Sequence, residues 1–181
     1  MRLHELLKNK DYFGLREEFD RSKRTLSEES ALYYRAWLDN AFNKCKESNA
    51  AIDDLLARPA VQSADSLVTE LLTLRAGNFT RLNRYREAAE TYRQLIDRQD
   101  PLRDSAACAN YVNMHGLWSA VAGVPPTTVE KPGRDVTIDA ERDMFNMLLV
   151  PVRSGGVAEK FVFDSGAGLS TVPLSVAQSM G

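Results

Sequence analysis

A change in residue pattern near residue 124 constrains the fold of this chain more than any other feature. Before it, glycine and proline are sparse, and leucine, alanine, arginine and glutamate recur with helical spacing. After it, the chain reads "GVPPTTVEKPG" and continues in runs rich in β-branched residues. We therefore expect a mainly α protein with a helical domain over residues 1–123, a stiff proline-containing linker over 124–133, and a small β segment over 134–181.

Apolar residues in the first part recur every three or four positions, which predicts antiparallel helical hairpins. The sequence "SEES", beginning at Ser27, supplies an N-cap for one of the longer helices. The predicted helices are two short ones separated at Asn9–Asp11, then longer ones over about 27–44, 48–58, 65–82, 85–99 and 102–123.

Two of the predicted hairpins share a pattern of large, small and aromatic residues. The stronger copy has Leu72, Ala76, Phe79, Ala88, Tyr92 and Leu95, followed by Pro101, and the weaker copy has Leu32, Ala36, Ser48, Ile52 and Leu55. Small residues allow two helices to approach closely where they cross. The pattern resembles tetratricopeptide repeats, although the proline lies one place late, and such stacks commonly bind a peptide or protein partner. We expect Asn78, Arg81 and Asn83 to be exposed and solvated rather than ligand-binding.

Composition and charge exclude several classes of function. The formal net charge is -2 with acids and bases interspersed, so there is no basic surface for nucleic acid. The chain has no apolar run near the roughly 20 residues of a transmembrane helix. We predict no cofactor: His4, His115, Cys45 and Cys108 are scattered, which provides no zinc ligand set and no legible disulfide framework.

The β segment predicts a hairpin that ends in an acidic residue. "DVTIDA" (135–140) alternates weakly, "MFNMLLVPV" (144–152) reads as a strand, "RSGG" is a tight turn, and "VAEKFVF" (157–163) is the returning strand. Pro151 cannot donate a ladder hydrogen bond, so we expect it at an edge or where its nitrogen faces outward. Asp164 follows the second strand, and residues 175–181 begin a helix.

The sequence "DSGAG", residues 164–168, is compatible with several roles. A phosphate-binding loop would have more glycines and a lysine, and a nucleophilic serine would need a G-x-S-x-G motif and a histidine after His115; both are absent. An aspartic protease site needs an acid at a strand end followed by a turn containing glycine, as found here. The competing interpretation is an ordinary strand-ending turn, because Asp, Ser and Gly all favour turns.

The stretch "MLLVPVRSGGVAEKFVFDSGAGLSTVPLSVAQSMG" resembles the N-terminal part of a retropepsin-like aspartic protease domain, over roughly residues 136–181. The resemblance implies that Asp164 is the catalytic aspartate, that the Ser165 hydroxyl supports the loop, and that Gly166 lets the backbone fold beneath the carboxylate. Ala167 completes the signature. Ser165 replaces the commoner threonine, and Gly168 stands where the family usually has Ser or Thr. The order of helical repeats and then this domain also resembles a group of bacterial proteins.

One aspartate is insufficient for this chemistry. The carboxylates of a pair share a proton, so that the ionised one accepts a proton from water while the protonated one polarises the peptide carbonyl. Asp135, Asp139 and Asp143 lack the loop, so the second aspartate is expected from a homodimer or from sequence beyond Gly181. We expect the 181 residues to be an inactive fragment of a longer protease.

These observations predict an aspartic endopeptidase that acts on peptide or protein substrates, with the helices as an interaction module. The alternative is a non-enzymatic scaffold, in which helical repeats bind a protein partner and the β segment is an adapter. The compartment is not determined by the sequence. An envelope or periplasmic location would follow if a signal peptide has been removed, because members of the resembling group are often exported.

Overall fold

The structure is a computed structural model, and it describes residues 2–98, 105–125, 128, 130–167 and 170–180. The chain divides into two units, Met1–Thr128 and Val129–Gly181. This division falls inside the predicted linker, residues 124–133. The described residues are mainly helical and include a small three-stranded antiparallel sheet. Pro101 of the repeat pattern and Gly168 of the loop lie outside the described residues.

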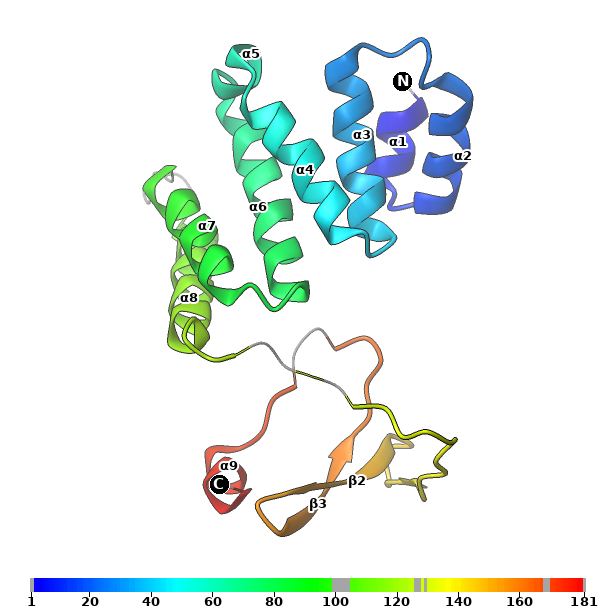
Figure 1. Cartoon of the computed structure of the whole chain (residues 1–181), viewed down its shortest axis with the longest axis vertical. Helices are drawn as coiled ribbons and strands as arrows, with labels where there is room; N and C mark the ends of the chain where they lie inside the picture. Colours follow the sequence, from blue (N-terminus) through cyan, green and yellow to red (C-terminus); the bar gives the residue numbers. More distant parts are fainter. Residues whose placement is uncertain (1, 99–104, 126–127, 129, 168–169, 181) are drawn as a thin grey trace. The chain divides into compact units, whose positions relative to one another are not determined.

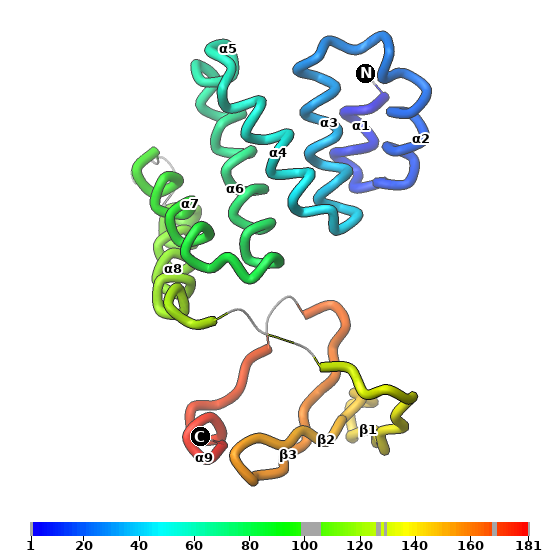
Figure 2. The backbone as a smooth tube through the Cα atoms, viewed as in Figure 1, coloured from blue at the N-terminus to red at the C-terminus, as the bar shows by residue number. Residues whose placement is uncertain are grey.

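The first unit is built of helices, and short turns join α1 through α7 (Figure 1). Its helices are α1 (Arg2–Lys8), α2 (Tyr12–Ser22), α3 (Glu28–Ala41), α4 (Cys45–Leu56), α5 (Pro59–Gln62), α6 (Asp65–Arg81), α7 (Tyr85–Arg98) and α8 (Ser105–Val121). Helix α5, whose first residue is a proline, was not predicted, and α4 begins at Cys45 rather than at residue 48. Figure 2 shows the chain turning back between α3 and α4 and between α6 and α7.

Side-chain caps and left-handed residues define several helix ends. The Asp11 side chain accepts a hydrogen bond from Gly14 N at the start of α2, and the Ser27 side chain accepts one from Ser30 N at the start of α3. Asn43 and Asn83 have φ of 60° and 55° in the turns after α3 and α6. Asparagine tolerates this conformation better than most residues, which explains the tight return at both hairpins.

Two groups of buried apolar residues hold the helical unit together. The smaller group joins α1, α2 and α3 through Leu3, Leu15, Phe19, Tyr34 and Leu38. The larger group runs from α3 to α8, and its fully buried members include Ala36, Ile52, Leu71, Ala76, Ala88 and Leu95. Buried alanines lie in each of α3, α4, α6 and α7, and small residues allow helices to approach closely.

Asn78 lies inside the helical unit and not on its surface, so the expectation that it is exposed was wrong. The side chain is 0% exposed, and its Nδ2 donates to Ser48 Oγ and to Asn49 Oδ1, each at 2.8 Å. Its Oδ1 accepts from Asn40 Nδ2 at 2.7 Å. The network joins α3, α4 and α6, which places a polar residue of α6 against two other helices rather than against water.

The other two polar residues of this group differ from Asn78. Arg81 is exposed as expected, and its Nη1 donates to Asn40 O at 2.9 Å. Asn83 is partly buried and accepts a hydrogen bond from the Tyr85 hydroxyl at 2.8 Å. Both side chains therefore contribute to the local structure of the hairpins.

The second unit contains strands β1 (Glu141–Arg142), β2 (Leu148–Ser154) and β3 (Val157–Val162), in the order β1-β2-β3, followed by α9 (Leu174–Met180). The hairpin of β2 and β3 was predicted, but the first expected strand was not: residues 135–140 form no strand and are exposed. Residues 144–147 were also expected in a strand and instead form a turn. The Asp143 side chain causes this turn by accepting hydrogen bonds from Phe145 N and Met147 N, both at 2.9 Å.

The register of the hairpin explains how β2 tolerates Pro151. Phe163 N donates to Leu148 O at 2.7 Å, which makes these two residues a hydrogen-bonded pair. Pairs alternate along an antiparallel ladder, so Pro151 and its partner Lys160 form a pair without ladder bonds between them. The Pro151 nitrogen therefore faces away from β3. It points to the side of β1, whose two residues pair with Leu148 and Leu149, so no residue of β1 lies opposite Pro151. The expectation that this nitrogen faces outward is confirmed.

Candidate functional site

Asp164 lies directly after the last hydrogen bond of the hairpin. Phe163 N donates to Leu148 O, and the chain leaves the sheet at the next residue. Asp164, Ser165 and Gly166, the three residues singled out from the sequence, are all exposed and consecutive in the turn that follows β3. The hairpin therefore presents the Asp164 carboxylate to solvent at one end of the sheet.

The turn after β3 is held by hydrogen bonds to Asp164 itself. Gly166 N donates to Asp164 Oδ1 at 2.8 Å, and Ala167 N donates to the Asp164 carbonyl oxygen at 3.2 Å. A Cβ atom at Gly166 would lie 3.3 Å from Asp164 Oδ1, closer than ordinary van der Waals contact. Glycine therefore allows the backbone to pass beneath the carboxylate, and one carboxylate oxygen is fixed while the other has no hydrogen bond to the described residues.

An open pocket of about 320 Å³ has Asp164 in its lining. It is lined by Arg142, Asn146, Met147, Leu148, Val162, Phe163, Asp164 and Ser165. Four of the lining residues are apolar, and one of them, Phe163, is 60% exposed. The pocket can therefore contact an apolar side chain of a ligand while a carboxylate and a hydroxyl lie beside it.

Asp164 is the sole acid among the eight described residues that line the pocket. Of the other aspartates of this unit, Asp143 uses its carboxylate to hold the 143–147 turn. Asp135 and Asp139 lie in the exposed stretch before β1 and do not line the pocket. The described part of the chain thus places one carboxylate in this pocket.

Sequence reasoning missed Arg142, the single cation of the pocket lining. Arg142 belongs to β1 and pairs with Leu148, which in turn pairs with Phe163, the residue before Asp164. Its Nη1 donates to Asn146 O at 2.8 Å. Since β1 and Asp164 are separated along the chain, only the strand register, which was not predicted for β1, could have identified this residue.

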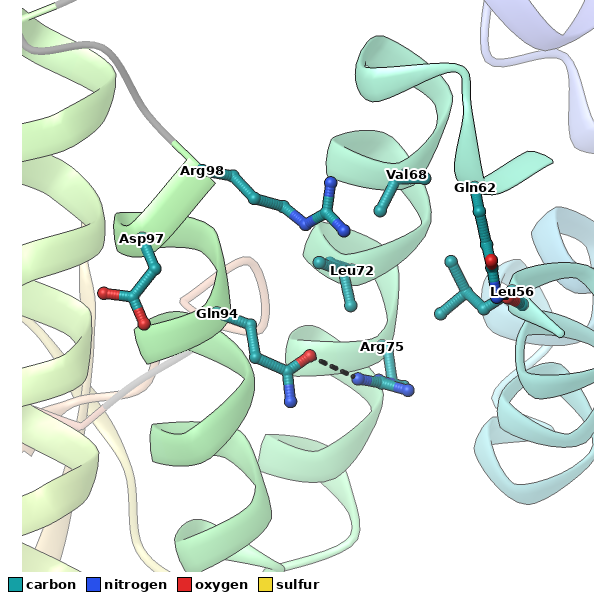
Figure 3. A pocket seen from close by; sticks show the side chains of 8 residues that line it. All are labelled: Leu56, Gln62, Val68, Leu72, Arg75, Gln94, Asp97 and Arg98. Carbon is teal, nitrogen blue, oxygen red and sulfur yellow. Dashed lines mark hydrogen bonds between the residues drawn. The ribbon is translucent and has the colours of Figure 1, made fainter. Parts of the chain in front are cut away.

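The helical unit has a larger open groove of about 820 Å³ (Figure 3). Leu56, Gln62, Val68, Leu72, Arg75, Gln94, Asp97 and Arg98 line it. In Figure 3, Gln94 of α7 and Leu56 lie on opposite sides of Arg75 of α6. Arg75 Nη1 contacts Asp53 Oδ1 at 3.1 Å, and its Nη2 donates to Gln94 Oε1 at 2.9 Å. The guanidinium therefore links α4, α6 and α7, and Gln94 and Arg75 were not identified from the sequence.

A second polar cluster joins α3 and α6. The Tyr33 hydroxyl and Trp37 Nε1 both donate to Glu70 Oε1. Burial, and then the hydrogen bond to Glu70, raise the pKa of the Tyr33 hydroxyl far above its usual value. The hydroxyl stays protonated at physiological pH, which suits a structural donor.

The two cysteines and His115 lie in helices, Cys45 in α4 and the other two in α8. Cys45 is buried and Cys108 partly buried, and both are free thiols. His115 Nδ1 lies 3.1 Å from Ala89 O. Within the described ranges, no group of three or more His, Cys, Asp or Glu side chains could hold a metal ion. None of the helices described is long and apolar enough to span a membrane.

Comparisons with known proteins do not assign the chain. No family model matches it, no curated protein matches it, and no solved structure matches it.

Proposed function

We propose that the second unit is part of a retropepsin-like aspartic endopeptidase and that Asp164 is one of its two catalytic carboxylates. The observation that carries the proposal is the hydrogen bond from Gly166 N to Asp164 Oδ1 at the end of β3, in a pocket open to solvent. It fixes a carboxylate at a strand end above a glycine turn, which is the local geometry the sequence resemblance implies.

The reaction needs a second carboxylate within a few ångströms of Asp164. Two such groups share one proton, so the ionised member takes a proton from water and the protonated member donates a hydrogen bond to the scissile carbonyl. A second copy of the same loop, from another molecule or from further sequence of a longer protein, supplies this partner. Ser165 supports the loop, and Gly166 orients the Asp164 carboxylate.

The helical unit is a tetratricopeptide-like interaction module in this proposal. Ala76 and Ala88, the small residues of the stronger repeat, are both 0% exposed, and so are Ala36 and Ser48 of the weaker copy. Ser48 Oγ donates to Ala36 O at 2.8 Å, which joins α3 to α4 directly. Burial of these four positions in both hairpins supports the proposal, in which the groove along α6 faces a peptide or protein partner.

The test is cleavage of an unfolded protein by the product of the complete natural reading frame between about pH 4 and pH 7. We expect Asp164→Asn to abolish cleavage, because an amide cannot share the proton. The matched control is Asp135→Asn, which removes an exposed carboxylate outside the pocket and should leave cleavage intact. Equal cleavage by the parent protein and Asp164→Asn, or none by either, would contradict the proposal.

A non-enzymatic scaffold is the second candidate, and one observation favours it. The two hydrogen bonds of Asp164 within residues 164–167 are those of an ordinary turn capped by an aspartate. In that function the groove along α6 binds a protein partner, and the β unit is an adapter. Retained partner binding in Asp164→Asn, together with absent cleavage by the parent protein, would favour the scaffold.

A further inference from the structure

The strand register places a positive charge at the edge of the Asp164 pocket. Arg142 is opposite Leu148, and Leu148 is opposite Phe163, so the three residues form a row across the sheet. Directly opposed residues in a sheet project to the same face. Asp164 follows the last member of that row, and all four residues line the same pocket.

The Arg142 guanidinium is held in place by the turn between β1 and β2. Its Nη1 donates to Asn146 O at 2.8 Å, and Asn146 has a φ of 62° in that turn. Asp143 N donates to Met147 O at 3.1 Å, and Asn146 N donates to Asp143 O at 3.0 Å, which closes the turn. The closed turn therefore fixes the position of Asn146 O, which in turn positions the Arg142 guanidinium.

The two acids that flank Arg142 in the chain, Glu141 and Asp143, are directed away from it, so Asp164 is the acid that shares the pocket with Arg142. Glu141 precedes Arg142, so its side chain projects to the opposite face of the strand, where Lys160 forms an ion pair with it. The Asp143 carboxylate accepts from the amides of Phe145 and Met147. Among the described residues, Arg142 has no carboxylate within ion-pair distance. Its charge is free to pair with a ligand that enters the pocket.

We propose that Arg142 makes this pocket select peptides with an acidic side chain beside a large apolar one. The acidic group pairs with the guanidinium, while Met147, Leu148 and Phe163 contact the apolar side chain. The interpretation of this binding preference as substrate specificity rests on the proposed endopeptidase function. Arg142 is a specificity residue in this proposal and not a catalytic one.

The experiment measures binding without cleavage, in protein that carries Asp164→Asn. Two short fluorescein-labelled peptides are compared by anisotropy at low salt: one contains Phe followed by Glu, and the other contains Phe followed by Gln. We expect the Glu peptide to bind about threefold to fivefold more tightly, which is the size expected for an exposed ion pair. Adding Arg142→Gln should remove the preference.

Two further variants distinguish loss of the positive charge at residue 142 from a general disturbance of the fold. Arg142→Lys keeps the positive charge and should retain much of the preference even though the contact with Asn146 changes. Arg153→Gln removes an exposed arginine of β2 outside the pocket and should leave the preference unchanged. Equal binding of the two peptides to the Asp164→Asn protein, no measurable binding of either, or an equal loss in Arg153→Gln would overturn the inference.

The outcome is distinguishable from failure of the proposed function. Absent cleavage by the parent protein would contradict the endopeptidase proposal and would leave a measured preference for the Glu peptide intact. Conversely, cleavage that depends on Asp164 but shows no Glu preference would overturn the role of Arg142 alone.

Discussion

Replacing Asn78 with alanine should destabilise the helical unit by about 3 kcal/mol. The substitution removes hydrogen bonds to Asn40, Ser48 and Asn49 inside the unit. A hydrogen bond contributes roughly 1 kcal/mol net, so three of them give about 3 kcal/mol before any relaxation of the cavity. The unpaired Asn40 amide adds to this loss, because a buried donor without a partner keeps its desolvation penalty.

Urea unfolding followed by tryptophan fluorescence measures the change in the free energy of unfolding of the helical unit. Both tryptophans, Trp37 and Trp118, lie in the helical unit, so the signal reports its unfolding. The matched control is Asn113→Ala on the exposed side of α8, which should change the free energy of unfolding by less than about 0.5 kcal/mol. A change below about 1 kcal/mol for Asn78→Ala would refute the role assigned to the buried network.

Two other changes test the packing and the electrostatics of the helices. Ala88→Leu should destabilise by about 1 to 3 kcal/mol in the same urea assay, because Ala88 is 0% exposed between α6 and α7, whereas Ala109→Leu on the exposed face of α8 should not. Burial raises the pKa of Asp39 above its usual 3.8, so the ionised carboxylate opposes folding as pH rises through that raised value. Asp39→Asn should therefore raise the melting temperature at pH 7 relative to the parent, and the difference should vanish below about pH 3.8; a lower melting temperature at pH 7 would contradict the assigned sign.

Local patterns predicted those parts of the fold that depend on nearby residues. Helical periodicity located α6 and α7, and the small residues Ala76 and Ala88 were recognised as positions of close packing. The hairpin of β2 and β3 and the position of Asp164 at its end also followed from alternation and turn residues. In each case a few neighbouring residues determine the backbone conformation.

Features that depend on distant contacts were missed. Asn78 was predicted to be exposed because it is polar, but the packing of α3 and α4 against α6 buries it. Residues 135–140 alternate weakly, but no neighbouring strand pairs with them in the described chain. Arg142 reaches the Asp164 pocket through pairing across three strands, which alternation within one segment does not reveal.

The most direct test of the endopeptidase proposal is the pH dependence of kcat/KM for peptide cleavage by the product of the complete natural reading frame. A pair of carboxylates that shares one proton predicts a bell-shaped profile in the acidic range, because activity requires one ionised and one protonated group. The profile should be absent in Asp164→Asn. Cleavage that rises steadily with pH, or that persists in Asp164→Asn, would contradict the assignment of Asp164 to a catalytic pair.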